Sequence, residues 1–203
     1  MKLMKDILDS HTHTTASGHA YSTLHEMAQA AADKGLELLG ITEHAMAMPG
    51  TCHEYYFMNM RILTRTMYGI EISNGAEVNS LYTEGRLDMD DYLLKQMDVV
   101  IASLHTPCMQ KDAGKAGNTR AVIKAMENSY VNILGHPDDS RFPLDYEAVV
   151  RSAKEQGVLL ELNNNSLHPL GARQGPLPND IEMLEYCKKY GAPIVLGSDA
   201  HTQ

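Results

Sequence analysis

The stretch DSHTHT at residues 9–14 decides the interpretation of this chain. In an extended strand, residues i and i+2 point to the same side, so His11 and His13 present two imidazoles together. The same spacing returns near the end of the chain, in the pair Asp199 and His201. Imidazole nitrogen and carboxylate oxygen suit Zn²⁺, and also Mn²⁺ or Fe²⁺. Both ends of the chain therefore predict metal ligands.

Working outward from this stretch, short apolar runs alternate with helical patterns. Continuous apolar runs are typical of parallel strands buried on both faces, and the alternation predicts βαβ units in one α/β domain over residues 1–203. Strands are expected at 7–10, 38–42, 70–78 (interrupted at Gly75), 99–103, 131–134, 158–162 and 194–196. Helices are expected at 22–34, 54–67, 119–127, 145–156 and 180–190, and residues 106–117 form the best candidate for a mobile loop.

Seven of the ten histidines lie at or just beyond the end of an expected strand. The C-terminal ends of parallel strands are where α/β proteins build their sites. These seven are joined by two acids at similar positions: His11, His13, His19, His44, His105, His136, His201, Glu77 and Asp199. Nine candidate ligands exceed what one tetrahedral ion can use, so two or three ions fit better.

Composition excludes several other classes of protein. The net charge of −9 disfavours binding to long nucleic acids, which depends on Lys and Arg. No apolar run is long enough to cross a membrane and no secretory signal is visible, so no membrane partner is expected. The three scattered cysteines predict no disulfide framework and favour the cytoplasm. Whether the chain forms a homo-oligomer stays open.

The motifs together resemble the PHP (polymerase and histidinol phosphatase) superfamily, in particular its YcdX-like phosphatase branch. Eight segments carry the resemblance in order along the chain: 9–14, 17–22, 40–44, 75–77, 103–105, 135–137, 161–164 and 197–201. The resemblance implies a distorted seven-stranded (β/α)7 barrel of PHP/TIM type with three divalent ions, Zn²⁺ first, at its C-terminal mouth.

The resemblance also implies how the ligands divide. The first ion takes His11, His13, Glu77 and Asp199. Glu77 bridges to the second ion, which His105 and His136 complete. The third ion takes His19, His44 and His201.

Two features depart from the family pattern. Glu43 stands where the family usually has Asp before the histidine. The chain also stops at Gln203, whereas family members continue into a final helical segment. Without that segment, we expect apolar surface to be exposed beside the last strand.

The expected activity is hydrolysis of small phosphomonoesters by an activated water, since a cluster of cations attracts phosphate despite the negative net charge. Glu77, Asp199 and Arg173 are the residues expected to take part directly, and Glu43, Asp9 and Asp138 are candidates to orient imidazoles. Four alternatives stay open: a metal-binding or scaffold protein without catalysis, a histidinol-phosphate phosphatase, a PHP-type nuclease or phosphodiesterase, and an amidohydrolase-like C–N hydrolase. The last of these usually needs a bridging lysine, and Glu77 occupies that position here.

Overall fold

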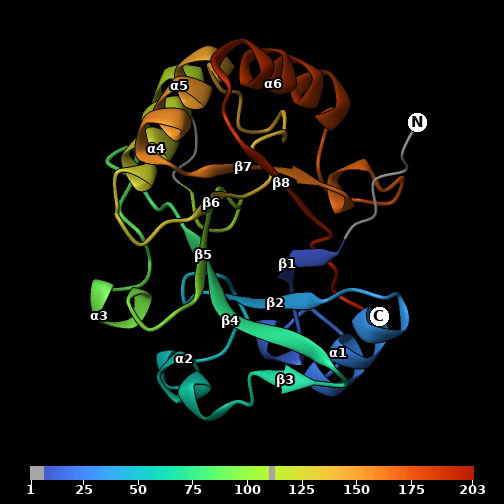
Figure 1. Cartoon of the computed structure of the whole chain (residues 1–203). Coiled ribbons are helices and arrows are strands. Elements are labelled where there is room, and N and C mark those ends of the chain that lie inside the picture. The colour runs from blue at the N-terminus through green and yellow to red at the C-terminus, as the bar shows by residue number, and fades with distance from the viewer. Residues whose placement is uncertain (1–6, 110–112) are drawn as a thin grey trace, which may run out of the picture.

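Seven parallel strands form a nearly closed barrel surrounded by helices in the computed structural model, which describes residues 7–109 and 113–203 (Figure 1). The parallel strands are β1 (Leu8–Thr12), β2 (Leu38–His44), β4 (Ile70–Asn79), β5 (Val99–Ser103), β6 (Ile133–Leu134), β7 (Leu159–Asn163) and β8 (Ile194–Gly197), hydrogen-bonded in that order. The helices are α1 (Leu24–Asp33), α2 (Glu54–Asn59), α3 (Asp91–Leu94), α4 (Gly114–Met126), α5 (Tyr146–Gln156) and α6 (Pro176–Tyr190). The expected (β/α)7 barrel is confirmed.

The two ends of the chain close the barrel. The His13 amide donates to the carbonyl of Ala200 at 2.9 Å, and the Asp199 amide donates to the carbonyl of His11 at 2.8 Å. These bonds join the segment after β8 to the end of β1. They bring the two i, i+2 pairs of the sequence, about 190 residues apart, to the same place.

Local sequence signals account for where the helices begin and end. Thr23 and Glu26 form the capping box that starts α1. The side chain of each residue accepts a hydrogen bond from the backbone amide of the other. Gly157 ends α5 with φ of 74°, a left-handed conformation that glycine adopts without steric cost. Pro176 begins α6, where its fixed φ suits a first helical turn.

The helix expected over residues 54–67 is wrong in length. α2 ends at Asn59 and one 3-10 turn follows at Met60–Ile62, after which Thr66–Met67 forms β3, antiparallel to β4. The turn between β3 and β4 has positive φ at both Tyr68 and Gly69, which is the geometry of a tight hairpin. Pairing with the edge of β4 therefore overrides the helical pattern.

Gly75 does not interrupt its strand, contrary to the expectation. β4 is continuous, and an added Cβ at Gly75 would lie 2.5 Å from the Val99 carbonyl oxygen and 2.9 Å from Thr42 Cγ2. Glycine is needed there for close packing between neighbouring strands. The loop expected at 106–117 is also shorter, because α4 begins at Gly114; residues 110–112 lie outside the described residues.

A large apolar groove lies on the outside of the barrel. A hollow of about 580 Å³ runs between β1, β8 and α6, and Leu8, Leu177 and Leu196 are 40–57% exposed there. The apolar surface expected beside the last strand is therefore present. Among the described residues, we find no helix of the length and apolarity needed to cross a membrane.

Candidate metal centre

All nine expected ligands lie together at the C-terminal mouth of the barrel, because parallel strands in register end at the same edge. His44, the last residue of β2, pairs in register with Glu77 on β4. Six of the nine are buried, His105 and His201 are half-buried, and His19 is exposed. The structure thus brings together every ligand that the sequence predicted.

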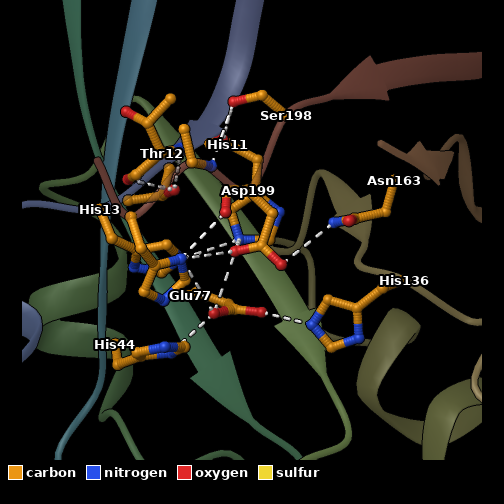
Figure 2. Close-up of polar contacts among 12 residues, drawn as sticks. His11, Thr12, His13, His44, Glu77, His136, Asn163, Ser198 and Asp199 are labelled. Carbon is orange, nitrogen blue, oxygen red and sulfur yellow. Dashed lines mark hydrogen bonds and ion pairs between the residues drawn. The ribbon is translucent and has the colours of Figure 1, made fainter. Parts of the chain in front are cut away.

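Four of these side chains form one group around the N-terminal motif (Figure 2). His11 Nε2 lies 3.1 Å from His13 Nε2, and Asp199 Oδ1 lies 3.2 Å from the same His13 atom. Glu77 Oε2 lies 3.6 Å from His11 Nε2 and 3.5 Å from His13 Nε2. Two imidazoles and two carboxylates therefore point at one small volume.

Glu77 joins this group to a second one. Its Oε1 lies 2.8 Å from His136 Nε2 and 3.4 Å from His105 Nε2. Its Oε2 lies 2.7 Å from His44 Nδ1, although the angles are not those of a hydrogen bond. One buried carboxylate therefore sits at the middle of the mouth, as Figure 2 shows.

The remaining histidines form a third group at the rim. His19 Nε2 lies 3.2 Å from His44 Nε2 and 3.1 Å from His201 Nε2. His44 therefore faces His19 with one ring nitrogen and Glu77 with the other.

These donors fit divalent ions. Two ligands of a tetrahedral zinc ion, with bonds of about 2.0–2.1 Å, lie about 3.3 Å apart, close to the imidazole–imidazole separations of 3.1–3.2 Å seen here. Glu77 Oε2 and His44 Nδ1 are buried and make no hydrogen bond within the described part of the chain. Buried polar atoms without partners are costly, and a cation bound among His44, Glu77 and His105, whose ligand atoms lie within 4.8 Å of one another, would satisfy both.

Comparisons with known proteins agree with this geometry. The PHP domain family matches residues 9–165. The chain is also 46% identical over 198 residues to a probable phosphatase of Clostridium novyi, across 98% of this chain and 80% of that protein. The chain belongs to the PHP domain family. A probable phosphatase of a Thermoanaerobacter species is 44% identical, over the same shares of the two chains.

Two solved structures resemble the fold of this chain at low sequence identity. One is a histidinol phosphate phosphatase from Lactococcus lactis complexed with zinc, L-histidinol and phosphate. It is 18% identical, with a TM-score of 0.64, covering 97% of this chain and 86% of that one. The other is archaeal ribonuclease P with mature tRNA, at 13% identity and a TM-score of 0.55, covering 95% and 74%.

The two carboxylates among the expected ligands of this PHP domain, Glu77 and Asp199, are buried at the mouth. Burial raises the pKa of Glu77, but His105, His44 and other imidazoles outweigh it and hold that pKa well below its usual value. The pKa of Asp199 is likewise well below its usual value, because His11 and further donors outweigh burial. Both carboxylates are therefore ionised and ready to bind cations at neutral pH.

Behind the ligands lie acceptors that the sequence analysis missed. Glu161 Oε1 accepts from His11 Nδ1 at 2.7 Å, and Asn79 Oδ1 accepts from His105 Nδ1 at 2.7 Å. Asp88 in turn receives the Asn79 amide at 2.7 Å, which fixes the orientation of that side chain. Such partners orient a ligating imidazole. Glu161 and Asn163 repeat the i, i+2 spacing of the ligand pairs. That spacing is a signal from which Glu161 could have been predicted.

The three acids expected to orient imidazoles do not contact one directly. Asp9 accepts from the backbone amides of His11 and Ser198. Glu43 binds hydroxyls and an amide of the loop after β1. Both carboxylate oxygens of Asp138 are buried without a hydrogen bond within the described residues, and burial raises the pKa of Asp138 to about 6.

Arg173 lies at the mouth, as expected. Its guanidinium donates to Asp199 Oδ2 at 2.7 Å and to Asn163 Oδ1 at 3.2 Å. Together with Arg141 and six of the nine expected ligands, it lines an open hollow of about 330 Å³. The hollow is large enough for a small phosphorylated molecule.

The other three histidines lie away from this centre. His25 contacts the Tyr68 hydroxyl at 3.1 Å, and His53 accepts from a backbone amide at the start of α2. His168 accepts from the amide of Leu170 in the loop after β7. Each has a local structural partner, so none is needed to explain the metal centre.

Proposed function

We propose that this PHP domain is a metal-dependent phosphatase that hydrolyses small phosphomonoesters at a trinuclear centre in the mouth of the barrel. The observation that carries the proposal is the convergence of seven imidazoles and two carboxylates, from distant parts of the chain, at the mouth of the barrel. The curated relatives are named probable phosphatases, which supports the same activity.

Three ligand sets are proposed, of which the first two share Glu77. They are His11, His13, Glu77 and Asp199; Glu77, His105 and His136; and His19, His44 and His201. Short separations between His11 and His13, between Glu77 and His136 and between His19 and His44 support this division, and His44 also lies close to Glu77 and His105. We expect Zn²⁺ in preference to Mn²⁺ or Fe²⁺, since imidazole suits zinc well.

Divalent ions held there would supply Lewis acidity toward the phosphoryl oxygens and lower the pKa of a water molecule. The protein itself would orient hydrogen-bond donors toward the phosphate. Arg173 presents a planar set of N–H donors, matched to phosphate, beside Asp199. Glu77 and Asp199 would neutralise part of the charge of bound ions.

The residues around the hollow bear on the class of substrate. Within the described residues its two arginines, Arg141 and Arg173, are each paired with an aspartate, so bound cations would have to supply the attraction for an anionic substrate. The lining contains no lysine, which disfavours the amidohydrolase alternative. The net charge of −9 disfavours long nucleic acids.

The test starts from metal-stripped protein that is reloaded with Zn²⁺, Mn²⁺ or Fe²⁺. We expect about three ions per chain by elemental analysis and metal-dependent hydrolysis of p-nitrophenyl phosphate. His13→Gln should lower both the bound metal and the turnover, whereas the matched control His168→Gln should change neither. A protein that binds three ions but hydrolyses no phosphomonoester would refute the activity, and one that binds no ions would refute the centre.

Histidinol phosphate is the second substrate to measure, because the Lactococcus lactis structure holds zinc, histidinol and phosphate. A kcat/KM for histidinol phosphate far above that for other small phosphomonoesters would favour the histidinol-phosphate alternative. Similar values for all of them would favour a broader phosphatase.

A further inference from the structure

Glu43 and Ser17 form a buried chain of hydrogen bonds that ends on a metal-facing histidine. The Ser17 hydroxyl lies 2.6 Å from Glu43 Oε2 and 3.0 Å from His13 Nδ1, and both Ser17 and Glu43 are fully buried. The opposite nitrogen of His13 is the one that faces His11 and Asp199. Whatever decides which nitrogen of His13 carries the proton therefore decides whether the ring offers a lone pair to a metal.

The directions of these hydrogen bonds follow from which atoms can donate. The backbone amide of His44 can only donate, and it reaches Ser17 Oγ at 3.0 Å. A carboxylate can only accept, so the single proton of the Ser17 hydroxyl goes to Glu43. Ser17 Oγ is then left as an acceptor toward His13, whose neutral ring must carry its proton on Nδ1. The Nε2 lone pair consequently faces the centre.

His13 differs here from the other oriented imidazoles. His11, His105 and His201 each hold the proton on Nδ1 against an oxygen with no proton to give, from Glu161, Asn79 and the Asp199 carbonyl. A serine hydroxyl can donate or accept, so Ser17 alone does not select a tautomer. The selection for His13 has to come from the group behind Ser17.

Glu43 also ties the loop after β1 to β2. Its carboxylate accepts from the Thr14 amide at 3.1 Å and from the Thr14 hydroxyl. The same loop continues to His19, which faces His44 and His201. One carboxylate therefore supports residues of two of the proposed ligand sets.

We propose that Glu43, acting through Ser17, is the positioning residue that holds His13 in the tautomer whose Nε2 faces the metal centre. The role rests on the metal site of the proposed function, but not on the reaction catalysed there. Glu43 would fix the tautomer of His13 without contacting a metal or a substrate.

The first measurement is the tautomer of each histidine in the metal-free protein, by long-range ¹H–¹⁵N NMR. We expect Nδ1–H at His13 in the wild type. In Glu43→Gln, the amide can donate to Ser17, whose proton is then free to point at His13, so the Nε2–H form should appear. Glu43→Asp keeps an acceptor-only group and should retain Nδ1–H. The signals of His105 and His201 should be unchanged in every variant.

The second measurement is the affinity for Zn²⁺ by competition with a chelator. We expect Glu43→Gln and Ser17→Ala each to lose about 10- to 100-fold in affinity, while the exposed control Glu37→Gln stays at the wild-type value. Because both substitutions break one chain, the double variant should lose little more than the worse single variant. Thermal unfolding of each metal-free variant shows whether it is folded, and Ser17→Ala tests the same link if Glu43→Gln is not.

Several results would overturn the proposal. These are an Nε2–H tautomer of His13 in the wild type, an unchanged tautomer in both Glu43→Gln and Ser17→Ala, or losses of affinity that simply add. None of these measurements uses turnover. A wild type that binds zinc with the expected tautomer but hydrolyses no phosphate would refute the proposed function and leave this role intact.

Discussion

Replacing Glu161 by glutamine removes an acceptor on which three donors converge. Its carboxylate receives His11 Nδ1 at 2.7 Å, the backbone amide of His136 at 2.8 Å and the Asn163 side-chain amide at 3.0 Å. Burial raises the pKa of Glu161, but His11 and the other donors lower it by more. The pKa is therefore below its usual value, and the group is held as an anion.

Glutamine offers one oxygen and one NH₂ group, so at least one of these three donors must lose its partner. An unsatisfied buried donor costs about 1–3 kcal/mol, which corresponds to a fall in Tm of about 2–12 °C for a chain of this size. If the amide NH₂ faces His11, the His11 proton moves to Nε2, where it blocks the metal. Zinc affinity should then fall by about 10- to 100-fold.

The assay is thermal and urea-induced unfolding of the wild type and Glu161→Gln, without metal and with saturating Zn²⁺. Without metal, the difference in unfolding free energy between the two proteins reports the lost hydrogen bond. With zinc the difference should be larger and reports the weakened site, because zinc binding to the native state adds stability. Glu37→Gln, an exposed change of the same kind, is the control. Equal unfolding free energies and equal zinc affinities for Glu161→Gln and the wild type would refute the reasoning.

Three further predictions concern the mouth and the groove. Arg173→Ala should lower kcat/KM for p-nitrophenyl phosphate by about 10- to 100-fold, since a charged hydrogen bond is worth about 1.5–3 kcal/mol, while unchanged turnover would exclude a role for Arg173 in substrate binding. Gly197→Ala should lower zinc affinity and Tm, because the new Cβ would lie 2.0 Å from Glu161 Oε1; a wild-type zinc titration would contradict this. Burial and the neighbouring Asp138 raise the pKa of Asp180 to about 7, so the folded state binds the extra proton and loses stability as pH rises from about 4 to 7. Asp180→Asn should therefore match the wild type near pH 4 and be more stable by about 1–3 kcal/mol at pH 8, as measured by urea unfolding with chelator present; an advantage that shrinks with rising pH would show the opposite sign.

The alternation of strands and helices and the positions of the candidate ligands could be predicted because both depend on local patterns. Apolar runs separated by helical segments indicate parallel strands, and polar residues at the ends of such strands share one edge. The boundary errors have local causes as well. The segment before Tyr68 has a helical pattern, but pairing with β4 turns it into a hairpin. A glycine such as Gly75 is typical of a break in a strand. Here the strand is continuous, and close packing against Val99 is the reason for the glycine.

From the sequence alone, the kinds of side chain that meet at the candidate metal centre were determined, because i, i+2 spacing places pairs such as His11 and His13 side by side wherever the strand lies. The tertiary structure decided what stands behind each ligand. Glu161 meets His11 across 150 residues, and Glu43 reaches His13 only through Ser17. These contacts depend on how the strands close into a barrel and on the rotamer of each buried side chain. Both result from long-range packing, which no local pattern in the chain encodes.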